Sequence, residues 1–369
     1  MEEEIITKQL SYFIMTKIKN NILISNLWKR GVISIVNIEF KKELSKRIYE
    51  ARKRSRPKRC LLCDKEITNL CNSHSVPQFV LKNLAENGKI VQSTMLMSFE
   101  DIDFFDIEKG INNSGTFKYI CDNCDNTFFK DYESEESLLG DITDKMLAEI
   151  ALKDELLNVA KRSQEKELYK QMEDRIFGID ILMEQHDLDL RDFHFDIELH
   201  KKEIIDNSKG AYQIIYKELL PYVVPIATQV SVTLKSDMYG YPVNDIYDFS
   251  PDVRMEGLHL VIFPLKKQTL VLTFYHKKNK KYRSLRHQFN SENSNKVKKF
   301  LNYVLFAYTE HYFLSKQISE RILQHDKLIQ LSKEIFQRPK FSRTIQPNYV
   351  PVKPDEIPNL LSKEWAIGE

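Results

Sequence analysis

Four of the five cysteines fall into two pairs that have the spacing of zinc ligands. Cys60 and Cys63 enclose two residues, and so do Cys121 and Cys124. Two thiolates at this spacing can reach the same tetrahedral ion, and a second pair completes its four ligands. Cysteines in this pattern are typical of metal binding in a reducing compartment rather than of disulfides. We therefore expect one structural zinc ion (Zn²⁺) at these four cysteines, in a cytoplasmic protein.

A second ligand set is compatible with the same residues. Cys60, Cys63, Cys71 and His74 would also supply four ligands to zinc. That set leaves the pair at Cys121 without a metal, so the four-cysteine set is favoured.

The segment between the two pairs carries a histidine in a distinctive setting. The chain runs Ser-His-Ser-Val-Pro-Gln-Phe from Ser73, and Asp125 follows the last cysteine directly. The order of CxxC pair, this histidine motif, second CxxC pair and acid resembles the HNH, or treble-clef, endonucleases. These include phage-type junction resolvases with an all-cysteine zinc. The likeness is stronger to HNH-like bacterial proteins that carry Ser-His-x-x-Pro-x-Phe, and it covers about residues 60–135.

The resemblance implies catalytic roles inside this module. His74 would be the general base that activates water, and Asp125, with Asn126 beside it, would hold a catalytic Mg²⁺ or Mn²⁺ on the scissile phosphate. The chemistry suits these side chains, because a neutral imidazole can take a proton at about pH 7. A carboxylate-bound divalent ion offsets the charge that builds up on the phosphate. The resemblance therefore predicts an endonuclease that hydrolyses phosphodiester bonds, in a phage-defence or mobile-element setting.

One position departs from the nuclease pattern. Those nucleases commonly place an Asp or Glu directly before the histidine, where this chain has Ser73. A hydroxyl cannot supply the second carboxylate, so Asn126, Asp131 or Glu133 would have to complete the metal site. The structural alternative is that His74 caps the following helix or donates a hydrogen bond without taking part in chemistry. The rival function is then a non-catalytic zinc module that binds nucleic acid or protein.

A dense basic run leads into the first cysteine pair, from Lys41 to Arg59. Cations at this spacing can lie along a phosphate backbone and release its counterions. The alternative is a solvated helix face without a ligand. We expect nucleic acid as the partner, with DNA favoured over RNA. The predicted contacts are Arg52, Lys53, Arg54, Arg56, Lys58 and Arg59.

Three further histidines, His186, His194 and His200, lie among four aspartates. His194 and Asp196 alternate with apolar residues, which predicts a half-exposed strand whose polar side chains face water. Metal-ligand spacing does not recur in this stretch. The sequence therefore predicts no metal site there.

Two runs of β-branched and aromatic residues, Leu258–Pro264 and Thr269–His276, are predicted as antiparallel strands. The basic cluster Lys277–Arg286 follows them, with His276 and His287 at its ends. We predict this cluster as a hairpin edge. Its alternative role is to extend a phosphate-binding surface.

The elements that must position these residues are predicted as an α+β fold. Apolar residues at helical spacing indicate helices before the zinc module, after it, and over Asn295–Leu314. Turn residues near Gly88 and Gly110 indicate short strands in the insert between the cysteine pairs. An antiparallel sheet packed with helices is expected at the C-terminal side. We expect five segments: a helical basic segment (1–58), a zinc-bound HNH-like treble-clef module (59–138), a helical linker or bundle (139–205), an α+β domain (206–338) and an extended proline-containing tail (339–369).

Composition limits the number of packed units and argues against a secreted or membrane protein. With 369 residues and 42% hydrophobic content, the chain can form about two or three packed units. The N-terminus lacks the basic residues of a secretory signal, and the most apolar run, Leu258–Leu265, is too short to span a membrane. We therefore expect no membrane partner. A protein partner is expected to bind through the C-terminal domain.

Overall fold

The computed structural model describes residues 33–66, 70–93, 105–171, 179–318, 320–337 and 351–368. The chain forms two compact units, one of Met1–Ser55 with Gln164–Phe177 and the other of Arg56–Ser163 with Gly178–Glu369. In the first unit, α2 (Ile33–Arg54) is the described helix of the predicted N-terminal segment. The rest of that helical prediction, residues 1–32, lies outside the described residues.

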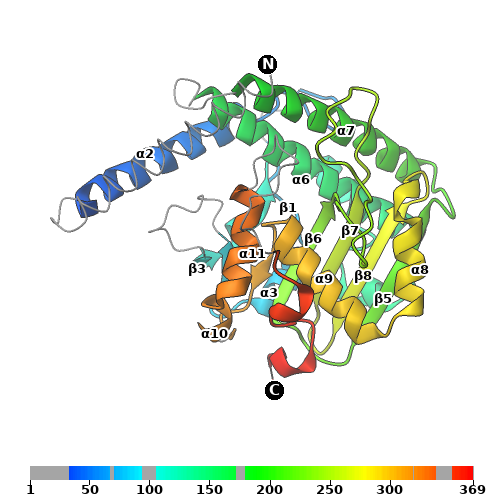
Figure 1. Cartoon of the computed structure of the whole chain (residues 1–369). Helices are drawn as coiled ribbons and strands as arrows, with labels where there is room; N and C mark the ends of the chain where they lie inside the picture. Colours follow the sequence, from blue (N-terminus) through cyan, green and yellow to red (C-terminus); the bar gives the residue numbers. More distant parts are fainter. Residues whose placement is uncertain are drawn as a thin grey trace, which may run out of the picture. The chain divides into compact units, whose positions relative to one another are not determined.

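The second unit is built on a seven-stranded antiparallel sheet in the order β3-β2-β9-β6-β7-β8-β5. Figure 1 shows β6, β7, β8 and β5 side by side. The two strands predicted around residue 265 are confirmed as β7 and β8, and every residue of both is buried. The strands are β2 (Lys89–Ser93), β3 (Phe105–Gly110), β5 (Tyr212–Leu220), β6 (Ile226–Val232), β7 (Leu258–Pro264), β8 (Thr269–His276) and β9 (Phe313–Leu314).

Alternation along β7 separates the two faces of this sheet, because successive side chains of a strand point to opposite sides. Leu260 and Ile262 pack into one apolar core, and Val261 and Phe263 pack into another. The first core is completed by α8 (Arg283–Ser291), α9 (Ser294–Tyr308) and α11 (Asp326–Gln337). The second is completed by α3 (Gln78–Leu84), α6 (Asp144–Lys170) and α7 (Ile179–Ile205). The sheet therefore lies between two helical layers, and each fully buried aliphatic side chain stabilises it by about 1.5–3 kcal/mol.

The region around the cysteines adds a small sheet and two short helices to the second unit. Strand β1 (Ser73–His74) pairs antiparallel with β4 (Thr116–Phe117). Helix α4 (Asp122–Phe128) begins after Cys121, and α5 (Glu135–Leu139) follows it. The strands predicted in the insert are β2 and β3, and β2 also pairs with β9 through Val91 and Leu314. Because of this pairing, the insert between the cysteine pairs is part of the large sheet.

The strand predicted around His194 is wrong, because residues 179–205 form the continuous helix α7. The alternation of polar and apolar residues is local, whereas the buried positions Asp192, Asp196 and His200 recur every four residues. Four-residue spacing is one face of a helix. Over 27 residues, this longer period determines the structure.

Two predicted boundaries near the end of the sheet are also corrected. The cluster Lys277–Arg286 is not a hairpin edge, since a 3₁₀ helix (Lys280–Tyr282) leads there directly into α8. The predicted helix ending at Leu314 stops at Tyr308, and Phe313 and Leu314 form β9. Phe313 and Leu314 are extended because β9 pairs with both β2 and β6.

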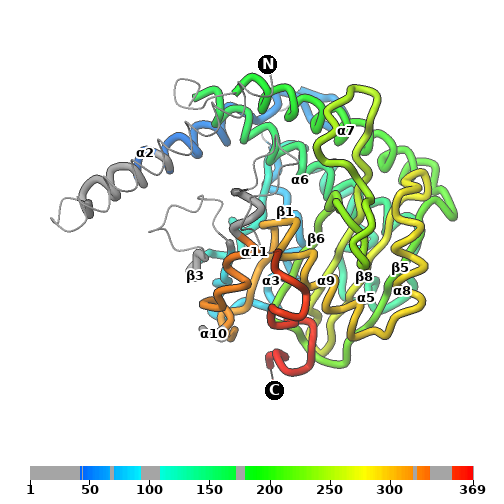
Figure 2. The backbone as a smooth tube through the Cα atoms, viewed as in Figure 1, coloured from blue at the N-terminus to red at the C-terminus, as the bar shows by residue number. Residues whose placement is uncertain are grey.

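The segment 351–368 belongs to the second unit, and Figure 2 traces it beside α9. Leu360 and Leu361 are buried, and the backbone N–H of Leu360 donates to Asn302 of α9 at 3.0 Å. The remaining short elements are α10 (Glu320–Leu323) and the 3₁₀ helices Ile111–Asn113, Pro354–Glu356 and Lys363–Trp365. Among the helices described, none combines the length and apolar character needed to cross a membrane.

Candidate functional site

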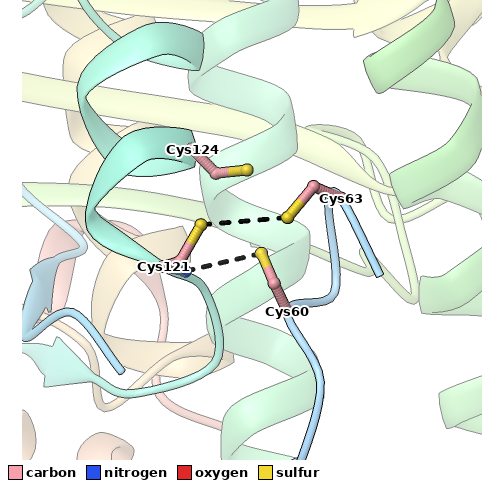
Figure 3. Close-up of side chains that lie close together, drawn as sticks. All are labelled: Cys60, Cys63, Cys121 and Cys124. Atoms are coloured by element: carbon pink, nitrogen blue, oxygen red, sulfur yellow. Dashed lines mark hydrogen bonds between the residues drawn. The ribbon is translucent and has the colours of Figure 1, made fainter. Parts of the chain in front are cut away.

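The four cysteines of the two CxxC pairs meet at one point (Figure 3). Their sulfur atoms all lie within 4.8 Å of one another, and the sulfurs of Cys63 and Cys121 are 3.8 Å apart. Four thiolates at about 2.3 Å from a tetrahedral zinc are separated by about 3.8 Å. Cys60 and Cys124 are buried, and the other two are half-buried. The donor set and its spacing therefore fit a closed, structural zinc site.

Local backbone geometry explains how each pair presents its sulfurs. After Cys60 the chain turns tightly, with the N–H of Asp64 donating to the Cys60 carbonyl at 2.9 Å and a φ of +54° at Asp64. Cys121 caps the start of α4, and its N–H points to the Cys60 sulfur at 3.4 Å. Burial raises the pKa of the Cys60 thiol, but backbone N–H groups led by that of Cys63 outweigh burial and lower it to about 7. This lowered pKa favours the metal-binding thiolate at Cys60, whereas burial raises the pKa of Cys121 and Cys124.

The alternative set with Cys71 and His74 is not assembled in the described part of the chain. The Cys71 thiol donates to Asp125 Oδ2 at 3.4 Å, and burial raises its pKa. His74 contacts the Ile111 carbonyl instead. Both residues therefore have partners of their own beside the cysteine cluster.

Asp125 lies at the centre of a polar network next to the zinc ligands. Its Oδ1 accepts a hydrogen bond from Ser73 at 2.6 Å and lies 3.3 Å from the ammonium of Lys153. Lys153 is 1% exposed and also contacts Glu133 at 2.5 Å. The ammonium packs over the ring of Phe129, 4.0 Å from its centre. Asp125 and Glu133 are thus joined by one buried cation.

His74 is half-buried on β1, directly after the serine that contacts Asp125. Its Nε2 lies 3.2 Å from the Ile111 carbonyl oxygen. Since a carbonyl can only accept, Nε2 carries the proton and Nδ1 keeps its lone pair. Burial lowers the pKa of His74, so the ring is neutral at about pH 7. The charges of Lys153, Asp125 and Glu133 all act on this imidazole.

Asn126, Asp131 and Glu133, the residues suggested to complete a catalytic metal site, have different surroundings from one another. Asn126 is exposed on α4. Asp131 forms an ion pair with Lys145 at 2.7 Å, away from Asp125. Glu133 is the member of this group that shares a partner with Asp125.

All six basic residues predicted to contact nucleic acid are exposed. Arg52, Lys53 and Arg54 end α2 in the first unit, and Arg56, Lys58 and Arg59 begin the second unit. Arg59 holds Asp64 in a two-point contact at 2.8 and 3.1 Å. Lys58 and Arg59 line an open groove of about 500 Å³, whose other cation is Lys201 of α7. The same groove is also lined by the acids Asp64 and Glu198, and Lys201 pairs with Glu198 at 3.6 Å.

A second cluster of potential metal ligands lies in the core, where the sequence predicted none. Glu155, His200 and His259 offer ligand atoms within 4.8 Å of one another, and all three are buried. Burial lowers the pKa of both histidines, which keeps them neutral. The prediction missed the cluster because its members come from α6, α7 and β7. The four-residue spacing of Asp192, Asp196 and His200 was the available signal, since it points His200 toward the core.

Comparison of the chain with protein-family models, curated proteins and solved structures gives no match.

Proposed function

We propose that the protein is an HNH-like endonuclease that hydrolyses phosphodiester bonds in nucleic acid, with His74 as its general base. The proposal is supported by the fixed orientation of two side chains, His74 and Asp125. His74 is held through Nε2 by the Ile111 carbonyl, and Asp125 is held through Oδ1 by Ser73 and Lys153. His74 Nδ1 keeps its lone pair for chemistry, and Asp125 Oδ2 accepts a weak hydrogen bond from the Cys71 thiol at 3.4 Å. Such fixed orientation is what a catalytic pair requires.

The chemistry follows from these two atoms. His74 Nδ1 takes a proton from a water molecule, whose oxygen attacks phosphorus while the bond to the leaving oxygen breaks. Asp125 Oδ2, with Asn126 nearby in sequence, is the oxygen donor available for Mg²⁺ or Mn²⁺. When bound, such an ion offsets the negative charge of the reacting phosphate. The Cys71 thiol at 3.4 Å is a weak donor and would be displaced easily.

The architecture around His74 supports a treble-clef module. One cysteine pair precedes β1, the other begins α4, and the β1–β4 pairing holds the histidine strand beside that helix. A zinc ion at the four cysteines would lock these pieces together and fix the direction of His74 relative to Asp125. The expected substrate is DNA rather than RNA, contacted through the exposed cations Arg56 and Lys58. Phage defence or a mobile element is a setting implied by the resemblance alone.

A second candidate function is a non-catalytic zinc module that binds nucleic acid or protein. The buried Lys153 favours it, because its ammonium already neutralises Asp125 at 3.3 Å and opposes the approach of a divalent cation. Ser73 adds no carboxylate that could restore the attraction. In this alternative, His74 serves as the hydrogen-bond donor that fastens β1 to Ile111.

Cleavage and binding assays separate the two candidates. The protein is incubated with single- and double-stranded DNA and RNA, with Mg²⁺, Mn²⁺ or EDTA, and compared with His74→Ala, Asp125→Asn and His287→Ala. His287 is an exposed helical histidine on α8 and serves as the matched control. The nuclease proposal predicts cutting that falls by about 10²–10⁴-fold in His74→Ala and is unchanged in the control. Tight binding without cutting by any of these proteins would support the non-catalytic module.

A further inference from the structure

The three residues of the buried core cluster come from elements on one face of the sheet. His259 lies on β7 two residues before Val261, so its side chain points to the same face of the sheet as Val261 and Phe263. That face carries the layer that contains α6 and α7. Glu155 belongs to α6 and His200 to α7. His200 and His259 are 2% exposed and Glu155 is 3% exposed. Helices and sheet therefore fix all three side chains from different directions.

In both histidines Nδ1 makes the hydrogen bond, and the Nε2 lone pair is available to a metal in the tautomer in which Nδ1 carries the proton. His200 Nδ1 lies 2.7 Å from the hydroxyl of Tyr212, and His259 Nδ1 lies 2.7 Å from Asp154 Oδ2. A neutral imidazole whose Nδ1–H donates to such a partner keeps the Nε2 lone pair for a metal. A partner on the second nitrogen is the usual support of a metal-binding histidine, and a carboxylate makes that histidine a stronger ligand.

Two buried carboxyl groups lie at the cluster, and as carboxylates they would favour a cation. Asp154 and Glu155 are carboxyls that are 1% and 3% exposed. The contact of Glu155 Oε2 with the amide of Asn158 at 3.0 Å brings no positive charge. The nearby guanidinium of Arg254 is engaged by both oxygens of Asp196, at 2.8 Å each. Buried carboxylates are stable when a counter-ion neutralises them, and a divalent ion would do so here.

We propose that Glu155, His200 and His259 bind a second divalent transition-metal ion, separate from the four-cysteine site. Two imidazole nitrogens and one carboxylate oxygen suit Zn²⁺ and disfavour Mg²⁺, which prefers oxygen ligands. Around tetrahedral zinc these atoms would be about 3.3 Å apart, so the ion draws together ligands that now lie within 4.8 Å. Three protein ligands leave a fourth position for water, as in catalytic rather than structural zinc sites.

Metal counting on the full-length protein tests this site. Purified protein is loaded with Zn²⁺, freed of loosely bound ion and analysed for zinc per chain. The wild type is expected to hold two zinc ions. His200→Ala, His259→Ala and Glu155→Gln are expected to hold one, the ion at the cysteines. His194→Ala is the matched control, because His194 is exposed on the same helix and should leave the count at two.

Cobalt gives an independent readout. Co²⁺ at four thiolates shows sulfur-to-metal charge transfer, whereas Co²⁺ at two imidazoles and a carboxylate shows weaker ligand-field bands without it. The second set of bands should vanish in Glu155→Gln and persist in Cys124→Ser. Tyr212→Phe should weaken the second site by about 10- to 100-fold, while Tyr216→Phe on the same strand should not.

Glu155→Gln and Tyr212→Phe preserve side-chain shape, so they keep the test valid if removal of a buried histidine prevents folding. One zinc per chain in the folded wild type, with cobalt bands of thiolate type alone, would overturn the proposal. The same holds if His200→Ala, Glu155→Gln and His194→Ala contain equal amounts of zinc. Neither result depends on nuclease activity at His74.

Discussion

At the scale of single residues, Lys153 stabilises the fold by pairing with two carboxylates. Its ammonium is buried and joins Asp125 to Glu133. Lys153→Met keeps the length of the side chain but leaves two carboxylates without their cation. We expect a loss of about 3 kcal/mol in the free energy of unfolding, because the pair is buried on the lysine side. Chemical denaturation measures it.

The control for this variant is Lys299→Met. Lys299 pairs with Asp355 at 2.6 Å, and both side chains are exposed, by 38% and 79%. Exposed pairs contribute about 0–1 kcal/mol. Equal losses in the two variants would contradict the role assigned to the buried ammonium.

A second residue, Glu149, should make stability depend on pH. Burial, helped by the charge of Asp131, raises the pKa of this carboxyl from 4.5 to about 8. Between pH 4.5 and about 8, Glu149 is therefore protonated in the folded protein and ionised in the unfolded chain. The stabilisation is complete below pH 4.5 and is lost as pH rises through about 8. The free energy of unfolding of Glu149→Gln should increase relative to that of the wild type by up to about 1.4 kcal/mol for each pH unit in this window.

Denaturation series at several pH values measure this difference. Glu136→Gln on the exposed side of α5 is the control and should follow the wild-type pH dependence. Parallel curves for wild type and Glu149→Gln would show that Glu149 is not a source of the pH dependence.

At the scale of elements, the approach of β4 to β9 depends on Gly115. Its φ is +61°, and a Cβ there would lie 2.6 Å from the ring of Phe313 and 2.8 Å from Ser75 Oγ. Gly115→Ala should cost about 1–3 kcal/mol or more, since it combines overpacking with an unfavourable φ. Gly110→Ala is the control, because the space around that glycine is open and its φ is −71°. Similar thermal unfolding of the two variants would contradict this packing.

Local patterns predicted some elements well and others poorly. The strands β7 and β8 carry β-branched and aromatic residues throughout, so composition alone identified them. The alternation around His194 covers too few residues to outweigh the helical period of α7. The pairing of β2 with β9 joins residues far apart in sequence, and nothing local encodes it. For the same reason, the meeting of Glu155, His200 and His259 could not be predicted, whereas the two CxxC pairs could.

At the scale of the whole molecule, zinc binding and the large sheet should be coupled. Residues 56–163 and 178–369 form one compact unit, and the insert between the cysteine pairs contributes β2 and β3 to the sheet. Binding of structural zinc contributes on the order of 10 kcal/mol to folding. Cys60→Ser should therefore lower the thermal midpoint of the sheet itself, in one transition followed by circular dichroism and fluorescence.

Cys71→Ser is the control for that experiment, because Cys71 lies outside the sulfur cluster and a serine can keep its hydrogen bond to Asp125. It should retain zinc and unfold near the wild-type temperature. A separate early transition in Cys60→Ser, with the main transition unmoved, would contradict the coupling.

X-ray absorption at the zinc edge tests whether all four cysteines bind one zinc ion beside His74. The measurement uses His200→Ala, which removes a ligand of the second proposed site and leaves the cysteines intact. Four sulfur atoms at about 2.3 Å from zinc are expected. Three sulfurs and one nitrogen, or two of each, would contradict the four-cysteine zinc site, because a ligand such as His74 would then have to replace a cysteine.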